Sequence, residues 1–368
     1  MKALIVSSRF PWPAYTGDRL RATIWLAALA RCAEVTLVSP RGAVPSGAPR
    51  LNFSAARRSA VLAAKRVAAV TRLPFQCLLA APYDWRAAIE RARRDFGPFD
   101  VTVVLLSRMH PWIREQLSGR TLLDAIDSLR RSAEERGRAA RGAAAFLWRV
   151  EQRRMARLEA DAARRYDRVV VLSEDEIADF DGNAVAVPNG IEARPLGDEP
   201  RRYDFGFWGR FPYFANADAA AWLLEEIWPA IRALRPQSTL ILGGAEAPRS
   251  LRRAAHERGI TLISPIDDVA AFARTIRVAL MPLRYGSGQS NKILEAAEAG
   301  CAVVAAPQAM RGLDPLTPFV RVATSSDAFA RAAVDSLGAT SPRLREAVES
   351  SYARSVTLER LAALAEGR

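Results

Sequence analysis

Short hydrophobic runs recur along the first half of the chain and alternate with longer stretches of helical periodicity. The expected strands are Ala3–Val6, Glu34–Val38, Val101–Leu106, Thr121–Leu123 and Arg168–Leu172. Most of these runs are apolar throughout and do not alternate with polar residues. That pattern is typical of strands buried on both faces of a parallel sheet, with helices as the connections.

The second half repeats this arrangement. Its expected strands are Asp204–Trp208, Ser238–Leu242, Ile260–Ile263, Val278–Met281 and Ala302–Ala305, again separated by helical patterns. Strands and helices in alternation indicate an α/β fold with a doubly wound parallel sheet. The chain therefore predicts two such sheets, one in each half.

Residues 189–202 interrupt the pattern between the two halves. This stretch contains Asn189-Gly190, Pro195, Gly197 and Pro200, all typical of turns and linkers. A chain of 368 residues also exceeds the size at which one hydrophobic core usually keeps growing. We expect Rossmann-like domains at 1–195 and 196–350, followed by a helix at 351–368 that packs back toward the N-terminal domain.

The cysteines and the termini bear on the cellular compartment. Cys32, Cys77 and Cys301 are odd in number, widely spaced and set among apolar residues, so a disulfide framework or a metal site is not expected. No apolar run reaches the roughly 18 residues that span a bilayer, and Met1 and Lys2 lead straight into the first strand. We expect neither a signal peptide nor an anchor, and a cytoplasmic protein.

The formal net charge is +13, and a field of that size attracts phosphates, nucleic acid or anionic lipid. One basic segment has the spacing of an amphipathic helix: Arg57, Arg58, Lys65, Arg66 and Arg72 surround Val61, Leu62, Val67 and Val70. Such a helix is typical of peripheral binding to an anionic membrane surface.

A second basic segment, between Ser128 and Asp167, predicts helices broken near Gly137 and Gly142. An apolar stripe is expected from Phe146, Leu147, Val150, Met155 and Leu158. We interpret this segment as a solvated helical region packed on the first sheet.

The stretch with the most specific chemistry is Pro282–Ala296. A strand ending at Pro282 meets a loop with Gly286 and Gly288, and a helix starts near Ser290. Backbone N–H groups and the helix dipole at such a turn favour an anion. The glycines permit close backbone approach, and Ser290 could cap the helix and donate its hydroxyl. The stretch predicts a cradle for phosphate groups.

Two charged residues follow in the same helix. Lys292 lies in the first turn, on the side of the anion, and Glu295 follows one turn later. Glu295 is too far along to share a phosphate with Lys292, but a carboxylate there could accept two hydrogen bonds from ribose hydroxyls. The alternative is that both are ordinary exposed helix residues.

The stretch resembles the donor-binding motif of family 4 and related (group 1) retaining glycosyltransferases, in the variant Gly-x-Gly-x-x-x-Lys-x-Leu-Glu-Ala. The resemblance extends more weakly along the chain, in matching order. It covers residues 7–13 with 17–19, residues 187–191, residues 208–210, residues 242–244 and residues 263–268. It implies the GT-B fold, two Rossmann-like domains facing across a cleft.

The resemblance also implies roles for particular residues. Arg210 and Lys292 would hold the diphosphate of a nucleotide sugar, Glu295 its ribose, and the loop at Ile266 its base. Gly17 would approach the transferred sugar or phosphate. The expected donor-binding residues are Gly17, Arg210, Gly243, Ile266, Gly288, Gln289, Ser290, Asn291, Lys292 and Glu295.

The chain departs from the family pattern at two places. Many relatives have a glutamate where this chain has Ser287, which puts the hold on the sugar ring in question. Many also have a lysine shortly after the Gly209-Arg210 pair, whereas residues 211–216 contain none. Neutralising the phosphates would then depend more on Arg210, Lys292 and the helix N-terminus.

Catalysis is expected to need no metal. Negative charge builds on the leaving phosphate, and fixed cations with a helix dipole stabilise it as it develops. The chain has only two histidines and no Asp-x-Asp at a strand end, so we expect no cofactor or metal ion. The resemblance implies retention, with the departing phosphate taking the acceptor's proton.

A position that is histidine in some relatives is Asp127 here. It would stabilise positive charge at the anomeric carbon or orient the acceptor hydroxyl, and capping of the following helix is the alternative. The expected catalytic residues are thus Arg210, Lys292 and Asp127.

The resulting hypothesis is a glycosyltransferase that uses a nucleotide-sugar donor, with UDP favoured over GDP. Its acceptor would be a saccharide or a lipid-linked sugar, in polysaccharide or glycolipid assembly at the inner membrane face. The alternatives are a nucleotide-sugar epimerase of the same fold, a homologue that binds nucleotide without turnover, and a non-enzymatic binder motivated only by charge. Nucleic acid is not an expected partner, since interleaved aromatic and basic motifs are missing.

Overall fold

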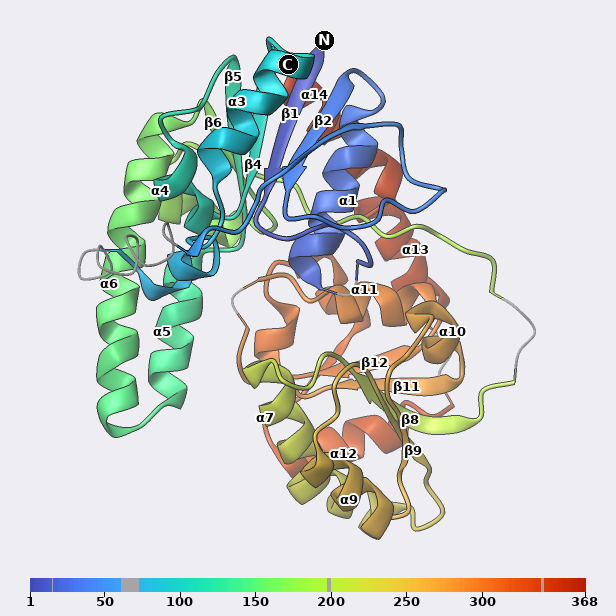
Figure 1. The fold of residues 1–368 in the computed structure, drawn as a ribbon. Coiled ribbons are helices and arrows are strands. Elements are labelled where there is room, and N and C mark those ends of the chain that lie inside the picture. Colours follow the sequence, from blue (N-terminus) through green and yellow to red (C-terminus); the bar gives the residue numbers. More distant parts are fainter. Residues whose placement is uncertain (15, 61–72, 197–199, 287, 339–340) are drawn as a thin grey trace. The chain divides into compact units, whose positions relative to one another are not determined.

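The computed structural model describes residues 1–14, 16–60, 73–196, 200–286, 288–338 and 341–368 (Figure 1). They form two compact units. Unit 1 consists of Met1–Asn189 and Ser355–Arg368, and unit 2 of Gly190–Arg354. The limits expected from the sequence, 195/196 and 350/351, differ from these by a few residues.

Unit 1 is built on a seven-stranded parallel sheet in the order β3-β2-β1-β4-β5-β6-β7. Its strands are β1 Lys2–Ser7, β2 Glu34–Ser39, β3 Asn52–Ala55, β4 Val101–Leu105, β5 Arg120–Ile126, β6 Arg168–Val171 and β7 Ala184–Ala186. Its helices are α1 Gly17–Leu29, η2 Phe75–Leu79, α3 Trp85–Phe96, η3 Ser107–Met109, α4 His110–Ile113, α5 Leu129–Ala139, α6 Gly142–Arg165, η4 Glu174–Phe180 and α14 Arg354–Glu366.

Both faces of this sheet are buried, as β1 illustrates. Leu4 and Val6 belong to one core cluster, which also contains Trp85 of α3. Ala3 and Ile5 point to the other face. There they join a second cluster to which α1 contributes Trp25 and α14 contributes Leu361 and Ala365. The C-terminal helix thus packs on the sheet of unit 1, on the same face as α1.

Unit 2 has a six-stranded parallel sheet in the order β10-β9-β8-β11-β12-β13. Its strands are β8 Tyr203–Trp208, β9 Leu240–Gly243, β10 Thr261–Ile263, β11 Ile276–Met281, β12 Ala302–Ala305 and β13 Arg321–Val322. Its helices are α7 Phe214–Trp222, η5 Leu223–Ile227, α8 Trp228–Leu234, α9 Arg249–Glu257, α10 Val269–Arg274, α11 Asn291–Glu298, η6 Pro307–Met310, η7 Asp314–Phe319, α12 Ser326–Asp335 and α13 Pro342–Ser351.

All the strands expected from the sequence are present, and the expected α/β fold class is confirmed. Three strands were not expected: β3, β7 and β13. Each lies at an edge of its sheet, and each is short. Edge strands are not sandwiched between neighbours, so they need no continuous apolar run; β3 contains Asn52 and Ser54.

The basic segment 128–167 differs from expectation. Gly137 lies inside α5, and the break falls between Ala139 and Gly142. Met155 and Leu158 of the expected apolar stripe are buried, but Phe146 and Leu147 are 64% and 61% exposed and do not pack on the sheet. Within the described ranges, no helix is both long and apolar enough to cross a membrane.

Candidate active site

The carboxyl end of β11 leads into the candidate phosphate cradle in unit 2. The chain leaves the strand at Met281, and α11 begins at Asn291 with Ser290 as its N-cap residue. Lys292 is half-buried in the first turn. Among the described residues, its ammonium has no hydrogen-bond or ion-pair partner. Burial lowers the pKa of Lys292, against the opposing effect of the Glu295 charge.

Glu295 is fixed by a neighbouring strand. The indole Nε1 of Trp208, at the end of β8, donates a hydrogen bond of 2.8 Å to Oε2 of Glu295. One carboxylate oxygen is therefore already engaged, and the two-oxygen ribose contact expected from the sequence would have to share it. Burial raises the pKa of Glu295, and the Trp208 hydrogen bond and the Lys292 charge lower it.

The turn after β8 lies directly beside Lys292. A Cβ atom on Gly209 would come within 2.9 Å of Lys292 Cε and 2.8 Å of Asn216 Nδ2. Gly244 approaches the same turn so closely that its Cβ would lie 1.8 Å from the Gly209 carbonyl oxygen. Only glycine fits at such a backbone approach. The ends of β8 and β9 and the start of α11 thus form one cluster.

Arg210, at the turn after β8, forms an ion pair with Glu246. Its guanidinium donates to both carboxylate oxygens of Glu246, at 2.8 Å and 3.0 Å. Its carbonyl accepts a 2.8 Å hydrogen bond from Asn216 Nδ2. Asn216 stands in the stretch where many relatives have a lysine, and here it holds the backbone of Arg210. Sequence reasoning missed both Glu246 and Asn216.

The glycine loop is held at two points. Gln308 Nε2 donates to the Gly286 carbonyl at 2.6 Å, and Gln289 Nε2 donates to the Gly312 carbonyl at 3.3 Å. The Oε1 of Gln289 and the Oγ of Ser290 are buried without a hydrogen-bond partner in the described part of the chain. Ser290 occupies the N-cap position, but its side chain makes no capping hydrogen bond, so that expected role was wrong.

Two further expected donor-binding residues, Gly288 and Asn291, lie in the same stretch of chain. Gly288 and Asn291 lie on either side of the Gln289-Ser290 pair, half-buried like Lys292. Their contact with a donor remains a prediction. Ser287, which stands where many relatives have a glutamate, lies outside the described residues.

The side chain of Ile266 packs against the backbone of Gly243. A Cβ on Gly243 would lie 2.5 Å from both Ile266 Cδ1 and Phe272 Cζ. Gly243 therefore makes room for two apolar side chains. Whether Gly243 and Ile266 also touch a nucleotide is untested, and both stay predictions.

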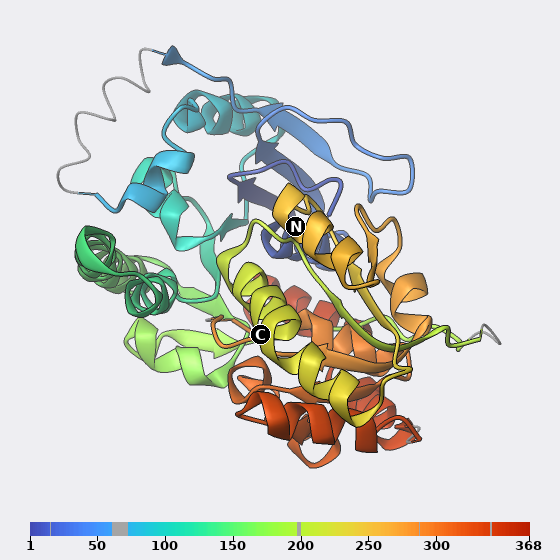
Figure 2. The same ribbon diagram turned by 90° about the horizontal axis from the view of Figure 1, so that it is seen from below.

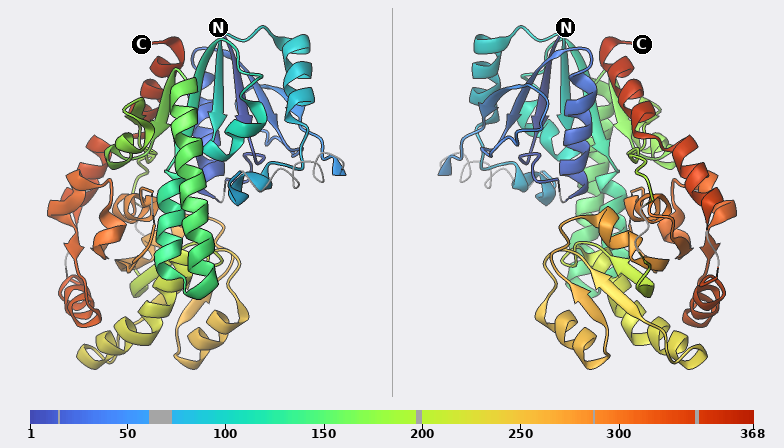
Figure 3. Two further views of the ribbon diagram at one scale, coloured as in Figure 1. Left: turned by 90° about the vertical axis from the view of Figure 1, so that its left-hand side faces the viewer. Right: turned by 90° about the vertical axis from the view of Figure 1, so that its right-hand side faces the viewer.

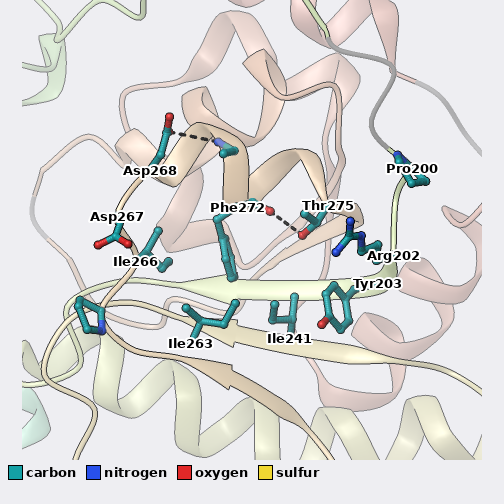
Figure 4. A pocket seen from close by; sticks show the side chains of 12 residues that line it. Pro200, Arg202, Tyr203, Ile241, Ile263, Ile266, Asp267, Asp268, Phe272 and Thr275 are labelled. Atoms are coloured by element: carbon teal, nitrogen blue, oxygen red, sulfur yellow. Dashed lines mark hydrogen bonds between the residues drawn. The ribbon is translucent and has the colours of Figure 1, made fainter.

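A pocket of about 450 Å³ lies beside this contact (Figure 4). Figure 4 shows Phe272 and Ile266 directed toward Ile241 and Ile263 on the sheet. The lining also includes Tyr203 and Thr275, near the starts of β8 and β11, and does not include Arg210, Lys292 or Glu295. This pocket runs along the face of the sheet, away from the phosphate cradle.

In unit 1, Gly17 is the first residue of α1, and a Cβ there would meet nothing within 4 Å. Asp127 follows β5, beside Ile126, which adopts the left-handed φ of 66°. The cap of α5 is Ser128, whose side chain accepts from the Arg131 N–H. The alternative of Asp127 as the capping residue was therefore wrong.

A buried cation that sequence reasoning missed lies at the same edge of unit 1. Arg108, just after β4, donates from Nη2 to Asp18 at 3.3 Å and to the Ser8 hydroxyl at 3.4 Å. Burial lowers the pKa of Arg108, while the charges of Asp18 and Asp127 raise it. Its position after a strand, like that of Arg9, was the signal available in the sequence.

Lys65, Arg66 and Arg72 of the expected amphipathic helix lie outside the described residues. Within the described part, no group of three or more His, Cys, Asp or Glu side chains is placed to hold a metal ion.

Comparison with known proteins places this geometry in context. Residues 202–338 match the family model described as "Glycosyl transferases group 1". A search of curated proteins finds no match to the chain. Sucrose-phosphate synthase from Thermosynechococcus elongatus is similar over 100% of this chain and 99% of its own, with a TM-score of 0.72 and 16% identity.

Two further solved structures are similar over the full length of both chains. HepE from Anabaena, in complex with UDP and glucose, has a TM-score of 0.70 at 11% identity. WaaG, a glycosyltransferase involved in lipopolysaccharide biosynthesis, has a TM-score of 0.64 at 17% identity. The GT-B fold is thereby confirmed, and so is the resemblance to group 1 glycosyltransferases.

Proposed function

We propose that the protein transfers a sugar from a nucleotide-diphosphate sugar to a hydroxyl group of an acceptor, with retention of configuration. The observation that carries this proposal is the state of Lys292. A half-buried ammonium without a partner among the described residues, at the start of a helix, is suited to an anion. The match of residues 202–338 to group 1 glycosyltransferases supports a donor diphosphate as that anion.

Arg210 and Lys292 would hold the diphosphate and stabilise the charge that develops on it as the sugar leaves. Glu295, oriented by Trp208, would accept a hydrogen bond from a ribose hydroxyl through its remaining oxygen. Asp127 would act on the acceptor side, from unit 1. A UDP-sugar is the favoured donor, because HepE is similar to this chain and its structures contain UDP or UDP-glucose.

The acceptor in this proposal is a saccharide or a lipid-linked sugar at the cytoplasmic face of a membrane, in polysaccharide or glycolipid assembly. The similarity to WaaG and the net charge of +13 support this assignment. Arg57 and Arg58 are exposed at the start of the expected amphipathic helix. Residues 61–72 of that helix lie outside the described residues.

Calorimetry on the folded protein with UDP and GDP tests the donor site. Lys292→Ala and Arg210→Ala should each cost about 1.5–3 kcal/mol of binding, because each removes a charge-assisted contact. Arg253→Ala, on the exposed face of α9, is the matched control and should leave nucleotide affinity unchanged. Unchanged nucleotide affinity in both site variants would remove the basis of the assignment.

The products formed from a nucleotide sugar distinguish a glycosyltransferase from an epimerase and from a homologue without turnover. Incubation with UDP-sugars and candidate acceptors, followed by NMR, should show a new glycosidic linkage with the donor's anomeric configuration. An epimer formed from donor alone would identify an epimerase, and tight binding with no product would identify a homologue without turnover. Transfer should persist in EDTA, since fixed cations would stabilise the leaving diphosphate; loss restored by Mg²⁺ or Mn²⁺ would contradict this.

A further inference from the structure

Helices α5 and α6 form a hairpin whose far end is strongly basic. Residues 136–150, which span the turn between the helices, contain four arginines and no acidic residue: Arg136, Arg138, Arg141 and Arg149. The carboxylates farther along the hairpin are occupied. Glu135, Glu151 and Glu159 are buried, and Glu134 pairs with Arg130 and Arg138. The exposed surface at this end is therefore almost purely cationic.

The hairpin extends beyond the sheet of unit 1. Figures 1 and 3 show α5 and α6 side by side and reaching past the ends of the strands, and Figure 2 shows them nearly end-on. The 24 residues of α6 correspond to about 36 Å, roughly twice the length of a strand of five or six residues. The first turns of α6 thus have no sheet to pack against.

Large apolar side chains are exposed at this end. Phe146 and Leu147 are 64% and 61% exposed. The next residue, Trp148, is half-buried by an edge-to-face contact with Phe75 at 4.9 Å and by the Arg136 guanidinium, 5.0 Å from its ring. Three consecutive helical residues point about 100° apart, so the apolar surface surrounds much of the helix end.

The arginines continue from this apolar end along one face. Arg149, Arg153 and Arg157 are exposed at intervals of four residues and have no ion-pair partner in the described ranges. A second copy of the chain, packed side by side through α6, would need apolar residues at these positions. The exposed apolar residues thus lie between cations, with Arg138 and Arg141 at the turn and Arg149, Arg153 and Arg157 along α6. Apolar side chains flanked by cations match the boundary between the acyl chains and the anionic headgroups of a bilayer.

We propose that residues 138–153, at the tip of the α5–α6 hairpin, dock on an anionic lipid surface. Phe146 and Leu147 enter the acyl-chain boundary, and Arg141, Arg149 and Arg153 contact lipid phosphates. This interaction surface is distinct from the expected amphipathic helix at Arg57–Arg72. It also does not depend on the donor site, so the two proposals can fail separately.

Cosedimentation of the full chain with vesicles tests the docking surface. Binding is expected to phosphatidylcholine vesicles that contain phosphatidylglycerol, and not to phosphatidylcholine alone. Salt should release it, because the Debye length falls to about 3 Å at 1 M. The triple variant Arg141→Gln, Arg149→Gln, Arg153→Gln should bind about a hundredfold more weakly, from about fivefold per arginine.

The matched control removes the same charge from unit 2, by Arg249→Gln, Arg252→Gln and Arg253→Gln on α9. It should bind vesicles like the wild type. Phe146→Ser with Leu147→Ser should also weaken binding, whereas Leu234→Ser, at an exposed apolar side chain of unit 2, should not. An environment-sensitive dye on Ala144→Cys should shift to the blue with anionic vesicles. All variants should retain the wild-type affinity for UDP.

Three outcomes would overturn the proposal. If both arginine triples weaken binding equally, only net charge matters. If the tip variants bind normally and neutralising Arg57, Arg58, Lys65 and Arg66 abolishes binding, the dock is the other basic segment. If analytical ultracentrifugation without lipid shows a dimer that Phe146→Ser with Leu147→Ser dissociates, the tip binds a second copy. If the wild-type protein binds vesicles but not UDP, the proposed function is contradicted and the docking proposal stands.

Discussion

The carboxylate of Glu246 holds the guanidinium of Arg210 through two hydrogen bonds, from Nε at 2.8 Å and from Nη2 at 3.0 Å. The two residues follow neighbouring strands, β8 and β9, and Glu246 adopts the left-handed φ of 56°. A carboxylate that binds both arms of a guanidinium resembles a phosphate in charge and geometry. Glu246 therefore binds the same guanidinium that the proposed donor diphosphate would bind.

Replacing Glu246 by glutamine should strengthen donor binding. The change removes the competing charge while keeping a side chain of similar size. Because both partners are substantially exposed, the pair is weak, and the gain should be roughly two- to fivefold in the Kd for UDP by calorimetry. Arg210→Ala combined with Glu246→Gln should show no such gain. A Kd that Glu246→Gln leaves unchanged would mean that Arg210 does not contact the diphosphate.

Glu295→Gln should reduce the preference for ribose over deoxyribose. The amide can still accept the Trp208 hydrogen bond, but it offers a weaker, neutral acceptor to a ribose hydroxyl. UDP should lose about 1 kcal/mol or more of binding, and 2′-deoxy-UDP much less. Glu257→Gln on exposed α9 is the control. Equal losses for both nucleotides would indicate that Glu295 has a structural role only.

The fold was predictable because its central strands are almost continuous apolar runs, which have few other stable arrangements. The edge strands β3, β7 and β13 lack that signal. The position of Lys292 and Glu295 in one helix followed from their spacing, since residues three apart share a helix face. Their neighbour Trp208 comes from another strand, and only the sheet order brings it to Glu295.

Contacts that depend on backbone detail could not be predicted. The Arg210–Glu246 pair needs β8 beside β9 and a left-handed residue after Gly244-Ala245. The exposure of Phe146 and Leu147 likewise depends on how far α6 extends past the sheet. Helical periodicity identified the buried Met155 and Leu158, but it does not show where a helix extends beyond the elements that it packs against.

Lys292→Met should stabilise the protein while it weakens donor binding. Burial lowers the pKa of Lys292, so holding the ammonium there costs free energy when no anion is bound. Below the lowered pKa the folded protein carries this cost in full, and the cost declines as pH rises from that pKa toward the ordinary value for lysine. Thermal unfolding without nucleotide should show a higher Tm for the variant than for the wild type. If Lys292→Met is less stable than the wild type, the unpaired ammonium does not destabilise the protein in the absence of an anion.

Glu176→Gln should make the protein more stable at alkaline pH and flatten its pH dependence. The Glu176 Oε1 accepts a 2.9 Å hydrogen bond from the Ser128 N–H, beside Asp127, and its Oε2 is buried without a partner among the described residues. Burial, with the charge of Asp127, raises the pKa of Glu176 to about 9. Glutamine keeps the acceptor for Ser128 and carries no titratable proton.

The stability of the wild type depends on pH because the folded and unfolded states bind the Glu176 proton with different pKa values. Between the ordinary glutamate pKa, about 4.3, and about 9, the folded protein holds this proton and the unfolded chain does not. Wild-type stability should therefore fall across that window, by on the order of 1 kcal/mol per pH unit, and level off above it. Urea unfolding at pH 6 and pH 9 measures this difference. Exposed Glu174, in the same turn of η4, provides the control Glu174→Gln, which should follow the wild type. If Glu176→Gln loses stability between pH 6 and pH 9 as steeply as the wild type, Glu176 is not the group that holds the proton, and the turn at Asp127 does not depend on its charge state.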